Sequence, residues 1–91
     1  MQHENSKKAS LIFETLAKII RNERISQKKS LRLLAYEYDI QKSLLSRIEN
    51  GTNEPKLISI WSICEALDIK VSELIKKVED NLPENFSLIE K

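Results

Sequence analysis

Five polar side chains between residues 41 and 47 carry hydrogen-bonding groups from which a binding site could be built. They are Gln41, Lys42, Ser43, Ser46 and Arg47. Arginine and lysine donate to guanine O6 and N7, glutamine can pair with adenine, and serine serves either base. A polar outer helix face is also what every small helical bundle presents to water. The residue types are therefore compatible with base recognition. Whether they form a binding site depends on the secondary structure that holds them.

The stretch from Ser30 to Gly51 positions these side chains, and it reads as two short helices joined by a tight turn. Apolar residues at i, i+3, i+4 and i+7 give the first helix one buried face. Ser30 can cap its start, and Gly51, the only glycine in the chain, is expected to end the second helix in a left-handed conformation. This pattern predicts a helix-turn-helix, in which the second helix, residues 41–50, enters the DNA major groove.

Helical periodicity covers most of the remaining chain. Residues 1–8 lack it and are predicted to form a flexible arm, while residues 9–80 form the domain. A helix is expected from Ala9 to about Arg24. Another runs from Leu57 to about Leu67, with Trp61 packed in the core.

The last part of the chain holds a fifth helix and a tail. Ser72 is a suitable N-cap for this helix. Residues 81–91 form a tail in which Phe86 and its apolar neighbours fit either a short strand or one helical turn after Pro83.

Length and composition restrict the class of protein. Ninety-one residues make one domain, and 41% hydrophobic with 32% charged residues give a modest core under a solvated surface. One Gly and two Pro leave little material for hairpins, so we expect an all-α fold. No apolar run approaches the roughly 20 residues of a membrane span, and no signal peptide is expected. The single Cys fits a reducing, cytoplasmic location.

The charge of the chain is polarised along its length. Residues 1–29 hold seven Lys or Arg against three Glu, residues 30–56 balance four against four, and residues 57–91 hold four against seven acidic residues. The net charge of +1 therefore hides a basic first third. A local positive patch is what attracts phosphates, so this distribution is compatible with DNA binding.

Catalytic and metal-binding chemistry find no support in the sequence. His3 is the only histidine and Cys64 the only cysteine, and Cys64 lies in an apolar stripe. Neither a nucleophile–base pair nor a cluster of metal ligands can be assembled from them. We therefore expect no enzyme activity, no metal, no cofactor and no small-molecule substrate.

Several motifs occur in order along the chain. They are I-R-x-x-R at Ile20, Arg21 and Arg24; Ala35; S-R-I-E-N-G from Ser46 to Gly51; Pro55; and A-L-D-I-x-V-S-E-L from Ala66 to Leu74. In this order and spacing, from about Leu16 to Ile75, the chain resembles lambda-repressor-like domains of the Xre/Cro type. The resemblance implies a five-helix DNA-binding domain, here with a short C-terminal extension.

The resemblance also implies roles for individual residues. The base-reading positions fall on Gln41, Lys42, Ser43, Ser46 and Arg47. Phosphate contacts are expected from Arg21, Lys28, Asn50, Thr52, Asn53 and Lys56. Arg24 and Glu49 are expected to form a structural ion pair between the first helix and the reading helix.

The chain departs from the family pattern at five places. Lys29 replaces a common apolar residue between the first two helices, which adds positive charge close to where the DNA backbone would pass. Leu31 stands where a phosphate-binding Gln is usual, so one backbone contact is in doubt. Lys28 replaces a common Gly, and Asp39 replaces the turn glycine, although Asp tolerates left-handed backbone better than most residues. Glu23 replaces a Leu, so the end of the first helix should pack less tightly.

Two functions from different classes fit these observations. The first is a sequence-specific transcriptional regulator that binds operator half-sites in double-stranded DNA as a homodimer. Phage-type repressors, restriction–modification controllers and antitoxins with a toxin or other regulator as partner all fit. The dimer contact is expected from Leu74, Ile75, Val78, Phe86, Leu88 and Ile89. The alternative is a protein-interaction module of the same fold that does not bind DNA.

Overall fold

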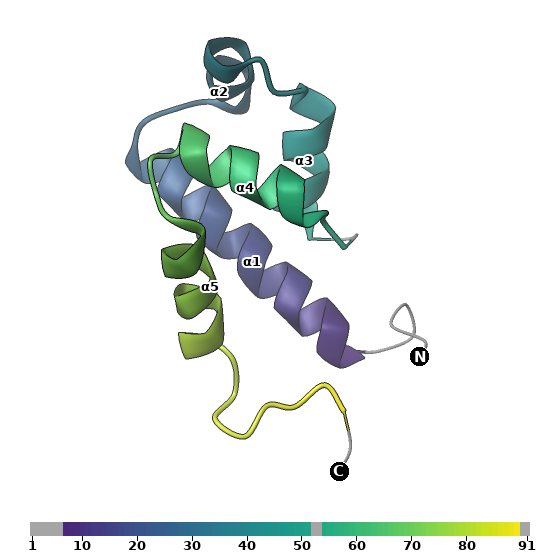
Figure 1. Cartoon of the computed structure of the whole chain (residues 1–91). Coiled ribbons are helices and arrows are strands. Elements are labelled where there is room, and N and C mark those ends of the chain that lie inside the picture. The colour runs from purple at the N-terminus through teal and green to yellow at the C-terminus, as the bar shows by residue number, and fades with distance from the viewer. Residues whose placement is uncertain (1–6, 52–53, 90–91) are drawn as a thin grey trace.

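The fold is all-α, as the sequence predicts. In a computed structural model the structure describes residues 7–51 and 54–89, and these form five helices (Figure 1). The helices are α1 (Lys7–Ser26), α2 (Leu31–Tyr38), α3 (Lys42–Asn50), α4 (Leu57–Ala66) and α5 (Val71–Asp80). The five-helix, lambda-repressor-like architecture is confirmed.

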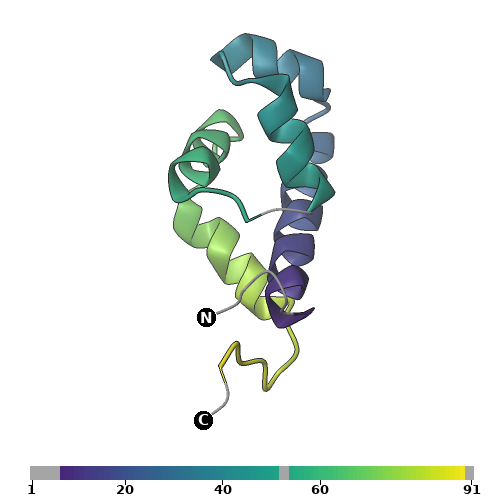
Figure 2. The ribbon, with the colours of Figure 1, turned by 90° about the vertical axis from the view of Figure 1, so that its right-hand side faces the viewer.

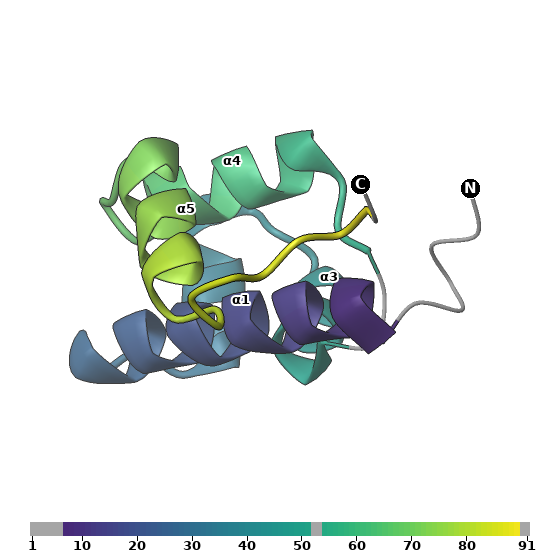
Figure 3. The same cartoon turned by 90° about the horizontal axis from the view of Figure 1, so that it is seen from below.

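The long helix α1 is the base on which the others are assembled. It packs against α3 and against α5, while α2 packs on α3 and α4 packs on α5. Seen from below, α1 forms one layer and α4 with α5 the other (Figure 3). Figure 2 shows α2 and α3 following one another around a sharp turn, as a helix-turn-helix requires.

One apolar core joins all five helices. Its fully buried side chains are Ile20, Leu34, Leu45, Ile63, Leu67 and Leu74. Leu31, Ala35 and Ile40 are partly buried and pack against this core, so the first motif helix and its turn are anchored as expected. Because α3 contributes only one side of its surface to the core, its other side faces outward.

Each of the first four helices is followed, within two residues of its end, by a residue in the left-handed conformation. These residues are Lys28 (φ 58°), Asp39 (φ 53°), Gly51 (φ 67°) and Asp68 (φ 57°). A Cβ at Gly51 would lie 3.2 Å from the Glu14 Cα, so glycine also allows α3 to end close to α1. The predicted cap at the other end of the motif is present, since the Ser30 hydroxyl accepts from the Leu33 amide at 3.0 Å.

Two local expectations were wrong. Helix α1 begins at Lys7, so Lys7 and Lys8 do not belong to an arm; residues 1–6 lie outside the described residues. Helix α5 begins one residue before Ser72, and its N-cap is Lys70, whose amide donates to the Glu73 carboxylate at 3.4 Å. The start of α5 is therefore capped by the Glu73 side chain, which accepts from the N-cap amide, and not by a serine side chain as expected.

Helix α4 does not pack Trp61 in the core as expected. Trp61 is 49% exposed and Leu57 is 63% exposed, whereas Ile63 is fully buried. The prediction failed because this helix is apolar on nearly every side, so periodicity could not tell which face meets the core.

The tail lies at the end of the molecule opposite α2 (Figure 1). Up to Ile89 it contains turns and bends and neither of the two elements considered for it, a strand or a helical turn. The Phe86 amide donates to the Pro83 carbonyl at 3.0 Å, and Leu82 packs against the core. The tail therefore adds one apolar contact to the domain before leaving it.

Candidate nucleic-acid interface

The outward side of α3 carries the predicted base-reading residues. Gln41, Lys42, Ser43 and Arg47 are exposed, and Ser46 is partly buried. Gln41 is the N-cap residue, and its side chain makes no capping hydrogen bond, so its amide remains available to a ligand. No acidic residue lies in the first turn of α3. The surface therefore combines cationic and neutral hydrogen-bonding groups next to a helix N-terminus, which favours an anionic partner.

A buried ion pair fixes the position of α3 on α1. Arg24 Nε donates to Glu49 Oε2 at 2.7 Å, and Arg24 Nη2 donates to Glu49 Oε1 at 2.9 Å. Glu49 is only 4% exposed, and its hydrogen bond raises the pKa of Arg24. Bidentate pairing of this kind fixes direction as well as distance. The contact expected between these two residues is present, and it sets the angle at which α3 is presented.

Arg24 also holds the connection between α1 and α2. Its Nη1 donates to the Lys29 carbonyl at 2.8 Å, which ties the left-handed turn at Lys28 to the same guanidinium. Lys28 itself is exposed. One side chain therefore positions both the reading helix and a lysine predicted to contact phosphate.

Arg21 also supports the last turn of α3. Its Nη2 donates to the Glu49 carbonyl at 2.7 Å, and its Nε lies 3.8 Å from the Glu49 carboxylate. A cation at this position interacts favourably with the negative end of the helix dipole. The side chain is still 49% exposed, so it can reach a phosphate as well as hold the helix.

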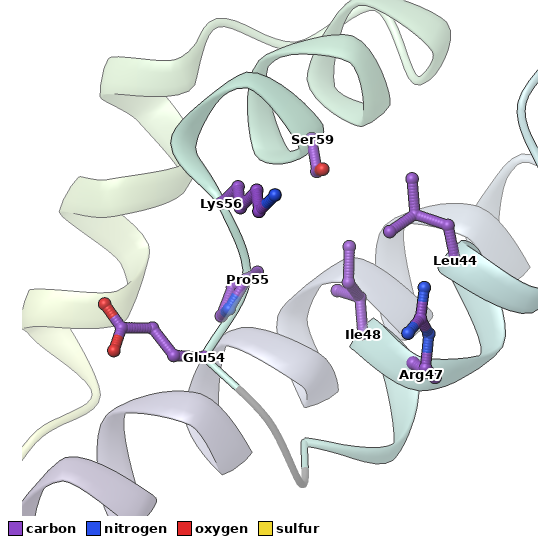
Figure 4. A pocket seen from close by; sticks show the side chains of 7 residues that line it. All are labelled: Leu44, Arg47, Ile48, Glu54, Pro55, Lys56 and Ser59. Carbon is purple, nitrogen blue, oxygen red and sulfur yellow. The ribbon is translucent and has the colours of Figure 1, made fainter. Parts of the chain in front are cut away.

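A hollow of about 290 Å³ separates α3 from the start of α4 (Figure 4). Leu44, Ile48 and Pro55 give it apolar walls, and Ser59 lies at its edge. In Figure 4, Lys56 extends from the start of α4 toward α3, and Glu54 points to the other side. Arg47, from the reading helix, lines the same hollow. Arg47 and Lys56 therefore border one surface although they come from different helices.

The structure describes some of the remaining predicted phosphate contacts but not all of them. Asn50 is exposed at the end of α3. Thr52 and Asn53 lie outside the described residues. Leu31 packs against the core and offers no donor, in agreement with its chemistry. Its neighbour Arg32 is exposed on the first turn of α2.

Two lysines near the interface use their charge within the domain. The Lys29 Nζ lies 3.1 Å from the Glu37 carboxylate and 5.2 Å from the centre of the Tyr38 ring, and the hydrogen bond that it donates to Glu37 raises the pKa of Lys29. Lys77 on α5 pairs with Glu23 on α1. The expected loose end of α1 is therefore closed by an ion pair where a leucine would otherwise pack.

The residues expected at a dimer contact divide into two groups. Leu74 and Val78 are buried in the core of their own chain, so they cannot meet a second copy. The expectation is wrong for these two residues because the apolar side of α5 packs into the core of its own domain. Ile75, Leu88 and Ile89 are exposed, and Phe86 is partly buried.

The described part of the chain shows neither a metal site nor a reactive thiol. No three His, Cys, Asp or Glu side chains come together there in a way that could hold a metal ion. Cys64 is 1% exposed, and burial raises the pKa of its thiol to about 11. In residues 7–51 and 54–89 no helix is long and apolar enough to cross a membrane.

The helix-turn-helix geometry and the cationic outer side of α3 define the class. The chain belongs to the helix-turn-helix family, whose model matches residues 14–74. It is also 31% identical over 67 residues to a protein named transcriptional regulator ClgR, in two strains of Mycobacterium tuberculosis, CDC 1551 / Oshkosh and ATCC 25618 / H37Rv. The match covers 74% of this chain and 60% of the relative. The chain thus spans less than two thirds of the length of these relatives.

Proposed function

We propose that this protein is a sequence-specific DNA-binding transcriptional regulator that reads operator half-sites with α3. The observation that carries the proposal is the pose of α3. Its polar side faces outward, while Arg24 and Arg21 hold its last turn through Glu49. A rigid helix with free donors is what reading base edges in the major groove requires. The relatives named as transcriptional regulators support the same assignment.

Homodimer formation is part of this proposal. A single domain of this kind contacts only a few base pairs, and two-fold pairing onto half-sites about one helical turn apart, roughly 34 Å, supplies affinity and selectivity. Repression, restriction–modification control and antitoxin activity all fit such a small regulator. A toxin or another regulator would then be the partner protein.

The test compares two cations that border the same hollow. Arg47→Ala should weaken binding to the selected operator by about 1–3 kcal/mol and leave a scrambled duplex nearly unaffected, because Arg47 lies on the reading helix. Lys56→Ala should weaken both duplexes alike and reduce the salt slope by about one. Both affinities are measured by fluorescence anisotropy across a salt titration.

Two further variants serve as controls. Arg47→Lys keeps the charge and removes the planar fork, so it should lose operator preference more than general affinity. Lys76→Ala removes an exposed lysine that pairs with Asp80 on α5 and should change neither duplex. Equal losses on both duplexes for Arg47→Ala would make it a positioning residue and refute its reading role.

A second function, a protein-interaction module of the same fold, is favoured by one observation. Leu31 packs into the core where a phosphate-binding side chain is usual. In that case random duplex DNA would bind with no steep dependence on salt, because few counterions would be released. The salt titration of the wild-type protein therefore separates the two functions before any variant is made.

A further inference from the structure

The outer face of α4 is apolar, and no described residue covers it. Ile58 is 74% exposed, and Leu57 and Trp61 are exposed beside it. Glu65 is the one charged residue within the ten residues of this helix. Helices that are apolar all round are normally covered all round, and an exposed apolar patch with a polar rim marks an interaction site.

The spacing along this face is symmetric about Trp61. Leu57, Trp61 and Glu65 are four residues apart, so they follow one line along the helix. If two copies of α4 lie antiparallel with a two-fold axis at Trp61, Leu57 of each copy meets Glu65 of the other. The two Trp61 side chains then face each other, and each copy presents the same residues to its partner, as a two-fold interface requires.

The charges along α4 favour the same arrangement. Glu65 lies in the last turn, where the helix dipole disfavours a carboxylate. At the start of the helix, Lys56 makes no side-chain capping bond and the first turn has no acidic residue. Antiparallel pairing would bring each Glu65 to the positive, uncapped start of the other α4, so both ends gain the partner that they lack in one chain.

The shape of the surface also fits. A hollow of about 390 Å³ lies at the end of the same face, between Trp61, Glu65 and the start of α5 at Val71. Ile58 projects at the opposite end of the face. In the antiparallel arrangement Ile58 of each copy comes to the hollow of the other, which pairs a protruding side chain with a cavity at both ends.

We infer that a second copy of this chain docks on the outer face of α4, antiparallel about a two-fold axis at Trp61. The inference rests on the proposed function for its purpose, since a regulator that reads half-sites needs a dimer. It replaces a contact centred on α5, where Leu74 and Val78 are buried in their own core. Trp61, the only tryptophan, reports on the interface directly.

The first experiment measures self-association without DNA. In sedimentation equilibrium, Ile58→Glu should raise the dimer dissociation constant at least about 30-fold, as expected for a central apolar contact. The matched control, Ile75→Glu, places the same charge on an exposed isoleucine of α5 and should change it little. Trp61 emission of the wild type should shift to shorter wavelength with concentration. Dissociation by Ile75→Glu and not by Ile58→Glu would overturn the inference in favour of α5 and the tail.

The second experiment tests the antiparallel geometry. Under mild oxidation Trp61→Cys should form a disulfide-linked dimer, because a residue on the two-fold axis faces its own copy. Leu57→Cys should not, since the two copies of that residue lie about 12 Å apart along the helices at 1.5 Å per residue. The native Cys64 is buried and leaves the background low. Cross-linking at position 57 and not at 61 would contradict the antiparallel arrangement.

The third experiment separates this inference from the proposed function. Ile58→Glu should still bind random duplex with a steep salt dependence, but it should lose cooperative binding to a duplex with two half-sites. If the wild type dimerises through α4 and binds no DNA, the proposed function fails and the inference stands. If the wild type binds DNA and sediments as a monomer at high micromolar concentration, the inference fails alone.

Discussion

Removing one member of the Arg24–Glu49 pair should strongly destabilise the domain. Arg24→Ala deletes two charge-assisted hydrogen bonds to Glu49 and one to the Lys29 carbonyl. It also leaves a carboxylate that is 4% exposed without its main partner, and breaking a buried pair in this way costs about 3–5 kcal/mol. Arg21 lies 3.8 Å from the same carboxylate and can compensate in part, so we expect about 3 kcal/mol.

That loss is large for so small a domain, whose total stability is on the order of 5–15 kcal/mol. Urea unfolding followed by circular dichroism measures it, with Arg32→Ala as a control because Arg32 is an exposed arginine on α2. The control should stay within about 0.5 kcal/mol of the wild type.

The double variant Arg24→Met, Glu49→Met tests whether the ion pair stabilises the domain or orients α3. Replacing both charges by apolar side chains of similar volume is often neutral or stabilising, so the double variant should unfold within about 1 kcal/mol of the wild type. If the pair exists to orient α3, operator affinity should nevertheless fall. A loss below about 1 kcal/mol for Arg24→Ala alone would show that the pair is not effectively buried, and the reasoning would be wrong.

Three further predictions follow from single positions. Gly51→Ala should destabilise the domain by about 1–3 kcal/mol in urea unfolding, because its φ is 67° and a Cβ would lie 3.2 Å from the Glu14 Cα. Ser30→Ala should destabilise the domain by about 1 kcal/mol because it removes the hydroxyl that caps the Leu33 amide. Ser30→Thr keeps a capping hydroxyl and should retain most of that stability. Cys64 should react with a disulfide reagent at pH 8 roughly 100-fold more slowly when folded, because its pKa is raised to about 11. Because the pKa of Cys64 is higher in the folded than in the unfolded protein, the stability gained by burying the neutral thiol is fully present below the unfolded pKa and is lost as the pH rises toward 11. Fast labelling of Cys64 in the folded protein would contradict its burial.

Sequence alone predicted the motif better than the surface around it. Ser30 and Gly51 were readable because a cap and a left-handed end are local properties of two or three residues. The apolar stripe of α3 fixed which of its side chains face outward. In α4, by contrast, seven of the ten residues are apolar and they lie on nearly every side, so nothing local could show that Trp61 faces out.

The parts of the site that escaped prediction depend on contacts between distant residues. Arg21 was assigned to phosphate, but its hydrogen bond to the Glu49 carbonyl spans 28 positions and has no sequence signal. Likewise, the Gln27 amide donates to the Leu67 carbonyl at 2.6 Å and joins the ends of α1 and α4. Such bonds appear only once the helices are packed, because they are made to backbone atoms that every residue possesses.

The left-handed helix ends have a consequence for how this protein could evolve or be engineered. Three of the four, at Lys28, Asp39 and Asp68, are occupied by residues other than glycine. Each stores conformational strain of about 1–3 kcal/mol that a glycine would release, less the entropy that glycine adds to the unfolded chain. At Lys28 the change would also remove a cation expected to contact DNA, so a gain in stability there is expected to weaken DNA binding. At Lys28, a substitution that relieves backbone strain is therefore expected to reduce DNA affinity. At Asp68, which lies far along the chain from α3, relief of the strain is not expected to affect DNA binding.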